Sequence, residues 1–347
     1  MSFDNGLIDL RSDTVSRPTP AMRRAMAEAE VGDDVFGDDP TVIRLEERAA
    51  ALTGQAAGLF VASGTMGNLV AMLTHAQRGA EVIVGADSHI YLNEVGGLAA
   101  LAALQACPIP NQPDGTLRLD DIFAGIREED VHHPRTRVIC LENTQNICGG
   151  VPLPPAYMRA VADLAHVHGL RLHLDGARLF NAAVALGVAA ADLAGLADSV
   201  MFCLSKGLSA PVGSVLCGPA DYIAVARRYR KQVGGGMRQA GVLAAAGLVA
   251  LDTMIERLDD DHAHARRLAA GLRDLEPLEF GPAEPATNMV YFNLRPSAAL
   301  LADHLVHHLR GHGILVEGGP RFRLVTHAWV SAADVDKVIA AFRQALA

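Results

Sequence analysis

The sequence predicts an α/β fold built on a mainly parallel β-sheet, followed by a smaller α+β unit. Short apolar runs alternate with helical patterns along the first two thirds of the 347 residues. Helices between parallel strands cover both faces of a sheet, so such strands read as continuous apolar runs. The expected strands are 58–61, 82–84, 138–141, 170–174 and 200–204, with helices at 67–77, 155–168 and 177–186.

An early helix is expected to begin at Asp39-Pro40. Aspartate at an N-cap accepts hydrogen bonds from free backbone N–H groups, and proline is tolerated in the first helical turn. Glu46 and Glu47 follow within the same helix.

The pattern changes after about Gly234. A long Ala/Leu/Gly-rich helical region, 238–254, and a charged segment, 256–267, lead to short strands and two further helices. We therefore predict an N-terminal segment (1–20) packed on the large domain, a large α/β domain (21–250) and a small C-terminal α+β domain (251–347).

The composition indicates a globular cytoplasmic enzyme or binding protein. Lys+Arg number 30 and Asp+Glu 39, and the resulting net charge of −9 argues against a protein that coats nucleic acid. The first residues lack the features of a signal peptide, and the longest apolar run, 242–251, is too short to span a bilayer. The five cysteines include no C-x-x-C and are expected to be free thiols, not a metal site. We expect neither nucleic acid nor membrane as a partner.

A carboxylate and a lysine follow two successive strands. Asp175 directly follows the strand at 170–174, and Lys206 follows the strand at 200–204. Ligands of open α/β sheets bind beyond the carboxyl ends of the strands. A desolvated lysine suits a Schiff base, and an aspartate paired with a ring nitrogen is typical of pyridoxal phosphate (PLP) sites. The alternative for Asp175 alone is a helix N-cap.

A candidate phosphate site follows the first strand. Residues 62–68 open a helix, where the backbone N–H groups of Gly64 and Thr65 could hold a phosphate. The turn is not a Walker P-loop or a G-x-G-x-x-G motif, and by itself it also fits an ordinary strand–helix turn.

Longer motifs carry a resemblance to a known family. The chain resembles the low-specificity L-threonine aldolases, which are PLP-dependent enzymes of the aspartate aminotransferase fold type. The matching segments are DLRSDTV (9–15), VGDDVFGDDPT (31–41), SGT (63–65), LENT (141–144), DGAR (175–178), LSKG (204–207), GGGMRQ (234–239) and RLVTH (323–327). The resemblance implies a PLP-dependent transferase-like large domain and a homotetramer, a dimer of dimers with active sites at the dimer interface.

The resemblance also implies how PLP is bound. Lys206 would form the Schiff base, Asp175 would keep the pyridine nitrogen protonated, and His89 would stack on the ring. Gly64 and Thr65 would bind the phosphate. Lys231 and Arg238 of the neighbouring subunit would reach the same phosphate.

The substrate residues are implied in the same way. Ser12, Arg178 and Arg323 would hold the substrate carboxylate, with Arg178 also beside the cofactor. His132 would lie near the β-hydroxyl. Whether His89, His132 or a water removes the hydroxyl proton stays open at this point.

The implied reaction is reversible cleavage of L-threonine or L-allo-threonine, and of other β-hydroxy-α-amino acids, to glycine and an aldehyde. The alternatives are a β-eliminating PLP lyase and a non-catalytic PLP-binding protein. Two positions depart from the common family pattern: Gln145 stands where histidine is expected, and Phe36 stands where tyrosine is frequent. The histidines at 304, 307, 308 and 312 are expected to lie on a solvated or interfacial helix and not in a zinc site.

Overall fold

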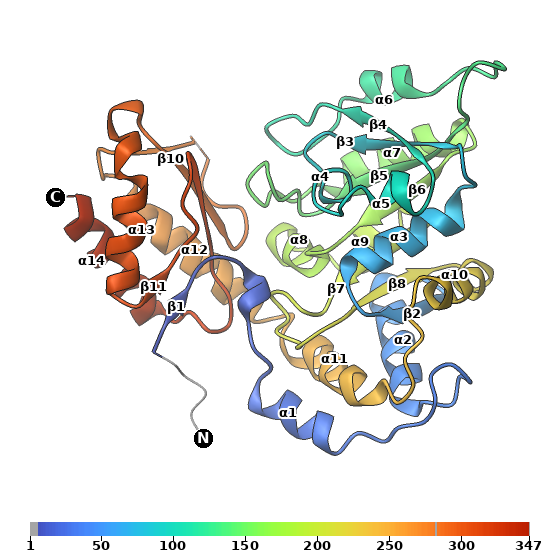
Figure 1. Ribbon diagram of the computed structural model, residues 1–347, viewed down its shortest axis with the longest axis horizontal. Coiled ribbons are helices and arrows are strands. Elements are labelled where there is room, and N and C mark those ends of the chain that lie inside the picture. The colour runs from blue at the N-terminus through green and yellow to red at the C-terminus, as the bar shows by residue number, and fades with distance from the viewer. Residues whose placement is uncertain (1–5, 282, 347) are drawn as a thin grey trace.

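The computed structural model describes residues 6–281 and 283–346, which form two lobes (Figure 1). A short connection between α11 (Gly241–Thr253) and α12 (Leu258–Leu272) leads from the large lobe to the C-terminal one. The predicted α/β class with a smaller α+β unit is confirmed. Among the described residues, no helix is long and apolar enough to cross a membrane.

A seven-stranded sheet forms the centre of the large lobe, in the order β2-β8-β7-β6-β5-β3-β4. The pairs β3–β4, β3–β5, β5–β6 and β6–β7 are parallel, whereas β8 runs antiparallel to both of its neighbours. The strands are β2 (Ala57–Val61), β3 (Glu81–Gly85), β4 (Gln105–Ile109), β5 (Thr136–Glu142), β6 (Arg171–Asp175), β7 (Ser199–Cys203) and β8 (Ser214–Gly218).

All five predicted strands of this sheet are present, but the sequence did not reveal β4 and β8. Strand β4 lies at the edge of the sheet, is partly exposed and contains Pro108, which an edge strand tolerates. Strand β8 follows β7 without an intervening helix and pairs with it in the antiparallel direction, which an alternating strand–helix pattern does not predict.

Helices cover both faces of this sheet (Figure 1). The predicted start of α2 (Pro40–Thr53) is confirmed, because Asp39 Oδ1 accepts hydrogen bonds from the backbone N–H groups of Thr41 and Val42 at 3.1 and 3.0 Å. The other helices of the large lobe are α1 (Pro20–Ala27), α3 (Gly64–His75), α4 (His89–Leu92), α5 (Gly97–Ala100), α6 (Leu119–Gly125), α7 (Pro155–Val167), α8 (Leu179–Leu186), α9 (Ala190–Ala194) and α10 (Ala220–Gln232).

The C-terminal lobe is a three-stranded antiparallel sheet packed on helices. Its strands β9 (Leu278–Phe280), β10 (Met289–Leu294) and β12 (Arg321–Val325) share a core with α12, α13 (Ala302–Gly311) and α14 (Ala332–Leu346). A short 3₁₀ helix at Pro296–Leu301 precedes α13.

The N-terminal segment contacts both lobes. Strand β1 (Ile8–Asp9) pairs in parallel with β11 (Ile314–Leu315) of the C-terminal lobe, while α1 packs against α11 of the large lobe. Between them lies a 3₁₀ turn, Asp13–Val15, at the junction of the lobes. The N-terminal part of the chain therefore contacts both lobes.

Candidate active site

Charged side chains gather at the carboxyl edge of the parallel strands. Strand β5 ends in Glu142 and strand β6 in Asp175, and these two residues are partners in the sheet register. Lys206 lies in the turn after β7, where its carbonyl oxygen accepts a hydrogen bond from Ser16 Oγ at 2.8 Å. The N-terminal segment thus holds the lysine turn beside the ends of β5 and β6.

Asp175 is buried and has two N–H donors. Its Oδ2 accepts a hydrogen bond from Asn68 Nδ2 at 2.8 Å, and its Oδ1 accepts one from the Ala177 backbone at 3.1 Å. The carboxylate is fixed in position at the end of the strand.

His89 begins α4 and is held from two sides. Its Nδ1 lies 2.9 Å from Glu94 Oε1, and its backbone N–H donates to Glu142 Oε2 at 2.6 Å. The hydrogen bond to Glu94 raises the pKa of the imidazole. Burial raises the pKa of Glu94, and burial together with the nearby Asp175 charge raises the pKa of Glu142 to about 7. With Nδ1 occupied, Nε2 is the ring nitrogen free to act in the site.

Asn68 joins these groups into one network. Its amide donates to Glu94 Oε1 at 2.9 Å as well as to Asp175, and its Oδ1 lies 3.2 Å from His173 Nε2. One ring nitrogen of His89, one carboxylate oxygen of Glu94 and one of Asp175 all lie within 4.8 Å of one another. Because Asn68 can donate two hydrogen bonds, it satisfies two buried carboxylates at once.

Arg178 forms a bidentate ion pair with a buried carboxylate. Its Nε and Nη2 donate to Asp13 Oδ2 and Oδ1 at 2.7 and 2.6 Å. Burial alone would raise the pKa of Asp13, but the Arg178 charge and hydrogen bonds, with a smaller contribution from Lys206, lower it to about 2. The guanidinium fork expected to hold a substrate is therefore mostly occupied, and Nη1 is the nitrogen that remains.

Arg323 reaches this region from β12 in the other lobe. Its guanidinium donates to Asn146 Oδ1 and to the Arg11 carbonyl, both at 3.1 Å. Ser12 lies beside Arg11, and its Oγ accepts a hydrogen bond from the Thr14 backbone at 3.2 Å. The structure thus brings Ser12, Arg178 and Arg323 to the junction of the two lobes, on the side of the large sheet where Lys206 lies.

The start of α3 also faces the carboxyl edge. Ser63 caps the helix by accepting a hydrogen bond from the Met66 backbone at 3.2 Å. Within the described residues, the backbone N–H groups of Gly64 and Thr65 have no hydrogen-bond partner. A Cβ at Gly64 would come within 2.9 Å of Cys203 Sγ at the end of β7, so glycine allows this close approach. Free N–H groups at a helix start are suited to an anion.

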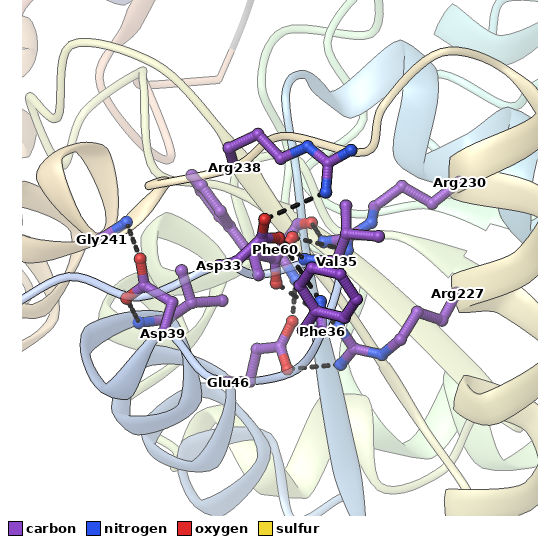
Figure 2. Close-up of polar contacts among 12 residues, drawn as sticks. Asp33, Val35, Phe36, Asp39, Glu46, Phe60, Arg227, Arg230, Arg238 and Gly241 are labelled. Carbon is purple, nitrogen blue, oxygen red and sulfur yellow. Dashed lines mark hydrogen bonds and ion pairs between the residues drawn. The ribbon is translucent and has the colours of Figure 1, made fainter.

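Lys231 and Arg238 are both exposed. Arg238 lies beside Asp33 of the loop 31–39 (Figure 2). Arg238 forms an ion pair with Asp33 at 3.0 Å, and the adjacent Asp34 is buried against Arg230 at 2.6 Å. Phe36, at the tip of this loop, is 76% exposed. The buried ion pair anchors the loop and leaves its tip on the surface.

His132 lies away from these residues. It precedes β5, on an exposed loop at the amino edge of the sheet, and its Nδ1 contacts Asp130 Oδ1 at 2.7 Å. Within one chain the structure does not bring His132 to Lys206, since the two residues belong to opposite edges of the same sheet.

Several site residues were not predicted from the sequence. Glu94, Asn68, Asp13 and Glu142 complete the hydrogen bonding of the predicted residues. Asp13 and Glu142 belong to the segments 9–15 and 141–144 that carry the resemblance, so they carried a signal of their own. Nothing local marked Glu94 or Asn68. Gln145, which departs from the family pattern, is buried and donates to the Asp87 carbonyl at 2.8 Å.

Comparison with known proteins assigns the family. The family model of the beta-eliminating lyases matches residues 9–295. The chain belongs to the beta-eliminating lyase family. The chain is 46% identical to low-specificity L-threonine aldolase 1 of Arabidopsis thaliana, over 98% of this chain and 96% of that protein. It is 45% identical to the low specificity L-threonine aldolase of Escherichia coli K12, over 98% of this chain and 100% of that protein. The predicted resemblance is confirmed, and with it the prediction of a lyase.

A solved structure of another protein has the same fold as this chain. The threonine aldolase of Leishmania major superposes with a TM-score of 0.83 at 22% identity, covering 98% of this chain and 100% of that chain. Beta-eliminating lyases and threonine aldolases are PLP-dependent.

Proposed function

We propose that this protein cleaves L-threonine, L-allo-threonine and other β-hydroxy-α-amino acids to glycine and an aldehyde, reversibly, with PLP as cofactor. The observation that carries the proposal is the joint position of Asp175 and Lys206 at neighbouring strand ends, in a chain 45% identical to a low-specificity L-threonine aldolase. A buried carboxylate and a lysine at one sheet edge are what PLP chemistry requires.

The donor set at this edge fits PLP. The unpaired N–H groups of Gly64 and Thr65 suit its phosphate, the buried Asp175 carboxylate suits its ring nitrogen, and Lys206 suits its aldehyde carbon. His89 would cover the ring face. When bound, the cofactor supplies an electron sink for the pair released from the Cα–Cβ bond.

The substrate carboxylate is assigned to the junction of the lobes. Arg323 provides a charged guanidinium, Ser12 a hydroxyl, and Arg178 its remaining Nη1. Fixing the carboxylate orients the Cα–Cβ bond relative to the cofactor ring. Asp13 keeps Arg178 in place by a bidentate pair, so Arg178 does not lose side-chain freedom when substrate binds.

His89 is assigned the β-hydroxyl proton, directly or through a water. Its Nδ1 is hydrogen-bonded to Glu94, which fixes the ring orientation and leaves Nε2 to accept the proton. Glu94 is a positioning residue, and Asn68 shares its amide between Glu94 and Asp175 so that the base and the cofactor partner are held together.

The remaining predicted residues are assigned to a neighbouring copy. Lys231, Arg238 and His132 are exposed, and we infer that a homotetramer, a dimer of dimers, brings them to a second subunit's site. Lys231 and Arg238 would add positive charge at the phosphate, and His132 would orient the β-hydroxyl. We assign the protein to the cytoplasm on its composition.

Product analysis tests the reaction. Purified protein with PLP is given L-threonine and L-allo-threonine, and acetaldehyde, glycine, ammonia and keto acid are measured. We expect acetaldehyde and glycine in equal amounts. Lys206→Ala should lose this activity, whereas Lys337→Ala, which changes an exposed lysine on α14, should retain it. Ammonia and a keto acid would identify a β-eliminating lyase instead, and PLP binding without either product would identify a non-catalytic protein.

Mixed oligomers test the assignment of Lys231 to a neighbouring subunit. The loop 234–236 packs beside α3 of its own chain, where a Cβ at Gly235 would lie 2.5 Å from Met66 Sδ. Lys206→Ala and Lys231→Ala subunits, each of low activity alone, are co-expressed. If Lys231 acts across the interface, one site of each mixed dimer contains both lysines and activity returns. If Lys231 serves its own chain, no activity returns.

A histidine pair tests the role of His132. His132→Ala is expected to lower kcat/KM for L-threonine by about tenfold, since it removes one hydrogen bond to a reacting group. His133→Ala changes the next residue of the same exposed loop and should leave kcat/KM unchanged. Equal values for the two variants would remove His132 from the site.

A further inference from the structure

A cavity of about 620 Å³ lies at the amino edge of the central sheet, the edge opposite to Lys206. Three segments form it: the connection from α3 to β3, the loop before β5 together with its first residues, and the turn between α7 and β6. The polar residues lining it are His75, Gln77, Arg78, His133, Arg135, Arg137 and Arg171. None of the described residues that line it carries a carboxylate.

The positive charge of this cavity is only half balanced by its neighbours. Arg171 pairs with Asp198 at 2.8 Å, and Arg135 pairs with Glu129. Arg78 and Arg137 have no ion pair or side-chain hydrogen bond within the described residues. Two unbalanced guanidinium groups therefore share one cavity in a chain whose net charge is −9.

The negative C-terminal ends of the neighbouring helices do not fully balance this positive charge. The C-termini of α3 and α7 lie beside the cavity, where His75 and Ala76 from the end of α3 and Gly169 just after α7 line it. The C-terminus of a helix carries the equivalent of about half a negative charge, and its effect falls off within one turn. Two such ends balance about one of the two unpaired arginines, and an excess of positive charge remains.

We propose that this cavity binds a small, multiply charged oxyanion of the phosphate-bearing class. Guanidinium groups bind the oxygens of such anions in a bidentate manner. The volume lies in the range of small-molecule sites, about 300–1,000 Å³. His75 and His133 add ring nitrogens to the lining. The site is separate from the cofactor phosphate, which belongs to the start of α3 at the other edge of the sheet.

Calorimetric titration of the PLP-loaded protein with inorganic pyrophosphate tests the proposal. Loading with PLP fills the cofactor phosphate position, so further binding reports another site. Three proteins are compared at low salt: the wild type, Arg78→Ala/Arg137→Ala, and the control Arg24→Ala/Arg310→Ala, which removes the same charge from exposed arginines of α1 and α13. We expect one equivalent to bind to the wild type and the control, and at least about tenfold weaker binding to the cavity variant.

Equal affinity in the three proteins, or no binding at millimolar pyrophosphate, would overturn the proposal. Equal weakening in the cavity variant and the control would do the same, because it would show a general effect of charge. A short single-stranded oligonucleotide forms the last arm. If it binds more tightly than pyrophosphate and depends on Arg78 and Arg137, the cavity belongs to a nucleic-acid surface, and the assignment to a small ligand is wrong.

Discussion

The two edges of the central sheet place charged groups in opposite surroundings. At the carboxyl edge Asp13, Arg178 and Asp175 are buried, and each has hydrogen-bond partners. At the amino edge Arg78 and Arg137 are exposed, and among the described residues they have no ion-pair partner. A buried charge without a partner costs several kcal/mol, whereas an exposed one costs little. The carboxyl edge is therefore organised before any ligand arrives, while the amino edge offers only charge and space.

A buried chain of hydrogen bonds connects the two edges. His75, which lines the cavity, contacts Ser199 Oγ at 2.7 Å; Ser199 contacts His173 at 2.8 Å; and His173 leads to Asn68 and Asp175. Burial lowers the pKa of His75 to about 4 and that of His173 to about 3. Both rings are neutral near pH 7, so the chain fixes Asn68 without adding a charge to the interior.

The largest expected effect follows from breaking the buried pair at the carboxyl edge. Asp13→Asn leaves Arg178 buried without its counter-charge, and it should lower the free energy of unfolding by about 3–5 kcal/mol. Asp9→Asn breaks the more exposed pair with Arg11 and should cost about 1 kcal/mol or less. Urea denaturation of both variants provides the measurement. Similar losses in the two variants would contradict the contrast between buried and exposed pairs.

The same pair predicts an acid-sensitive stability. The pKa of Asp13 is about 2 in the folded protein, against 3.8 for an unperturbed aspartate, so the carboxylate stabilises the fold above the unfolded pKa. This stabilisation is lost as the pH falls from about 4 to about 2. Unfolding measured across this range should show a smaller acid-dependent loss in Asp13→Asn than in the wild type. Identical pH profiles would mean that Asp13 does not titrate as described.

Removing the charge of Asp175 comes next. Asp175→Asn keeps the shape of the side chain and should lower kcat by about 100-fold or more, because it removes the charge that we propose faces the cofactor ring. Asp198→Asn, which changes a half-buried aspartate at the amino edge, should leave kcat within about twofold. Comparable kcat losses in both variants would show that the two edges are not functionally distinct.

Glu94→Gln is expected to act on the imidazole of His89. The Glu94 hydrogen bond raises the pKa of His89, so its removal should lower that pKa and shift the acidic limb of kcat/KM to lower pH. NMR titration of the His89 ring in the apoprotein measures the change without catalysis. Glu284→Gln, on an exposed loop, provides the control. A His89 pKa that is unchanged in Glu94→Gln would remove Glu94 as a positioning residue.

The smallest effect is expected at the amino edge. Arg137→Ala removes one of several like charges from the cavity and should change the free energy of unfolding by at most about 0.5 kcal/mol. Added pyrophosphate should stabilise the wild type and not Arg78→Ala/Arg137→Ala, as thermal unfolding would report. A loss of several kcal/mol in Arg137→Ala would show that this edge too depends on a specific partner.

Much of the fold followed from local patterns in the sequence. The apolar runs at 58–61 and 200–204 marked buried strands, and Asp39-Pro40 marked the start of α2. The edge strand β4 escaped because its residues are partly polar and exposed. The pairing of β1 was not predicted either, because its partner β11 lies about 300 residues later in the chain.

Some site residues were predictable and others were not. Asp175 and Lys206 follow strands that the sequence identifies, and the order of strands places neighbours at one edge. His132 shows the reverse: the resemblance assigned it to the site, yet its position before β5 puts it at the other edge of its own chain. A contact between His132 and Lys206 would require a second subunit, and one sequence does not specify such a contact.

The sequence by itself determined the α/β architecture, the edge of the sheet proposed to carry the chemistry and the positions of Asp175 and Lys206 at that edge. Tertiary structure alone decided which groups form hydrogen bonds and ion pairs with the site residues. Asn68 reaches Asp175 across 107 residues, and Arg178 reaches Asp13 across 165. Periodicity and turn residues record local interactions, which act over a few residues. Hydrogen bonds between buried groups depend instead on how distant strands and helices pack, and no local pattern encodes their partners.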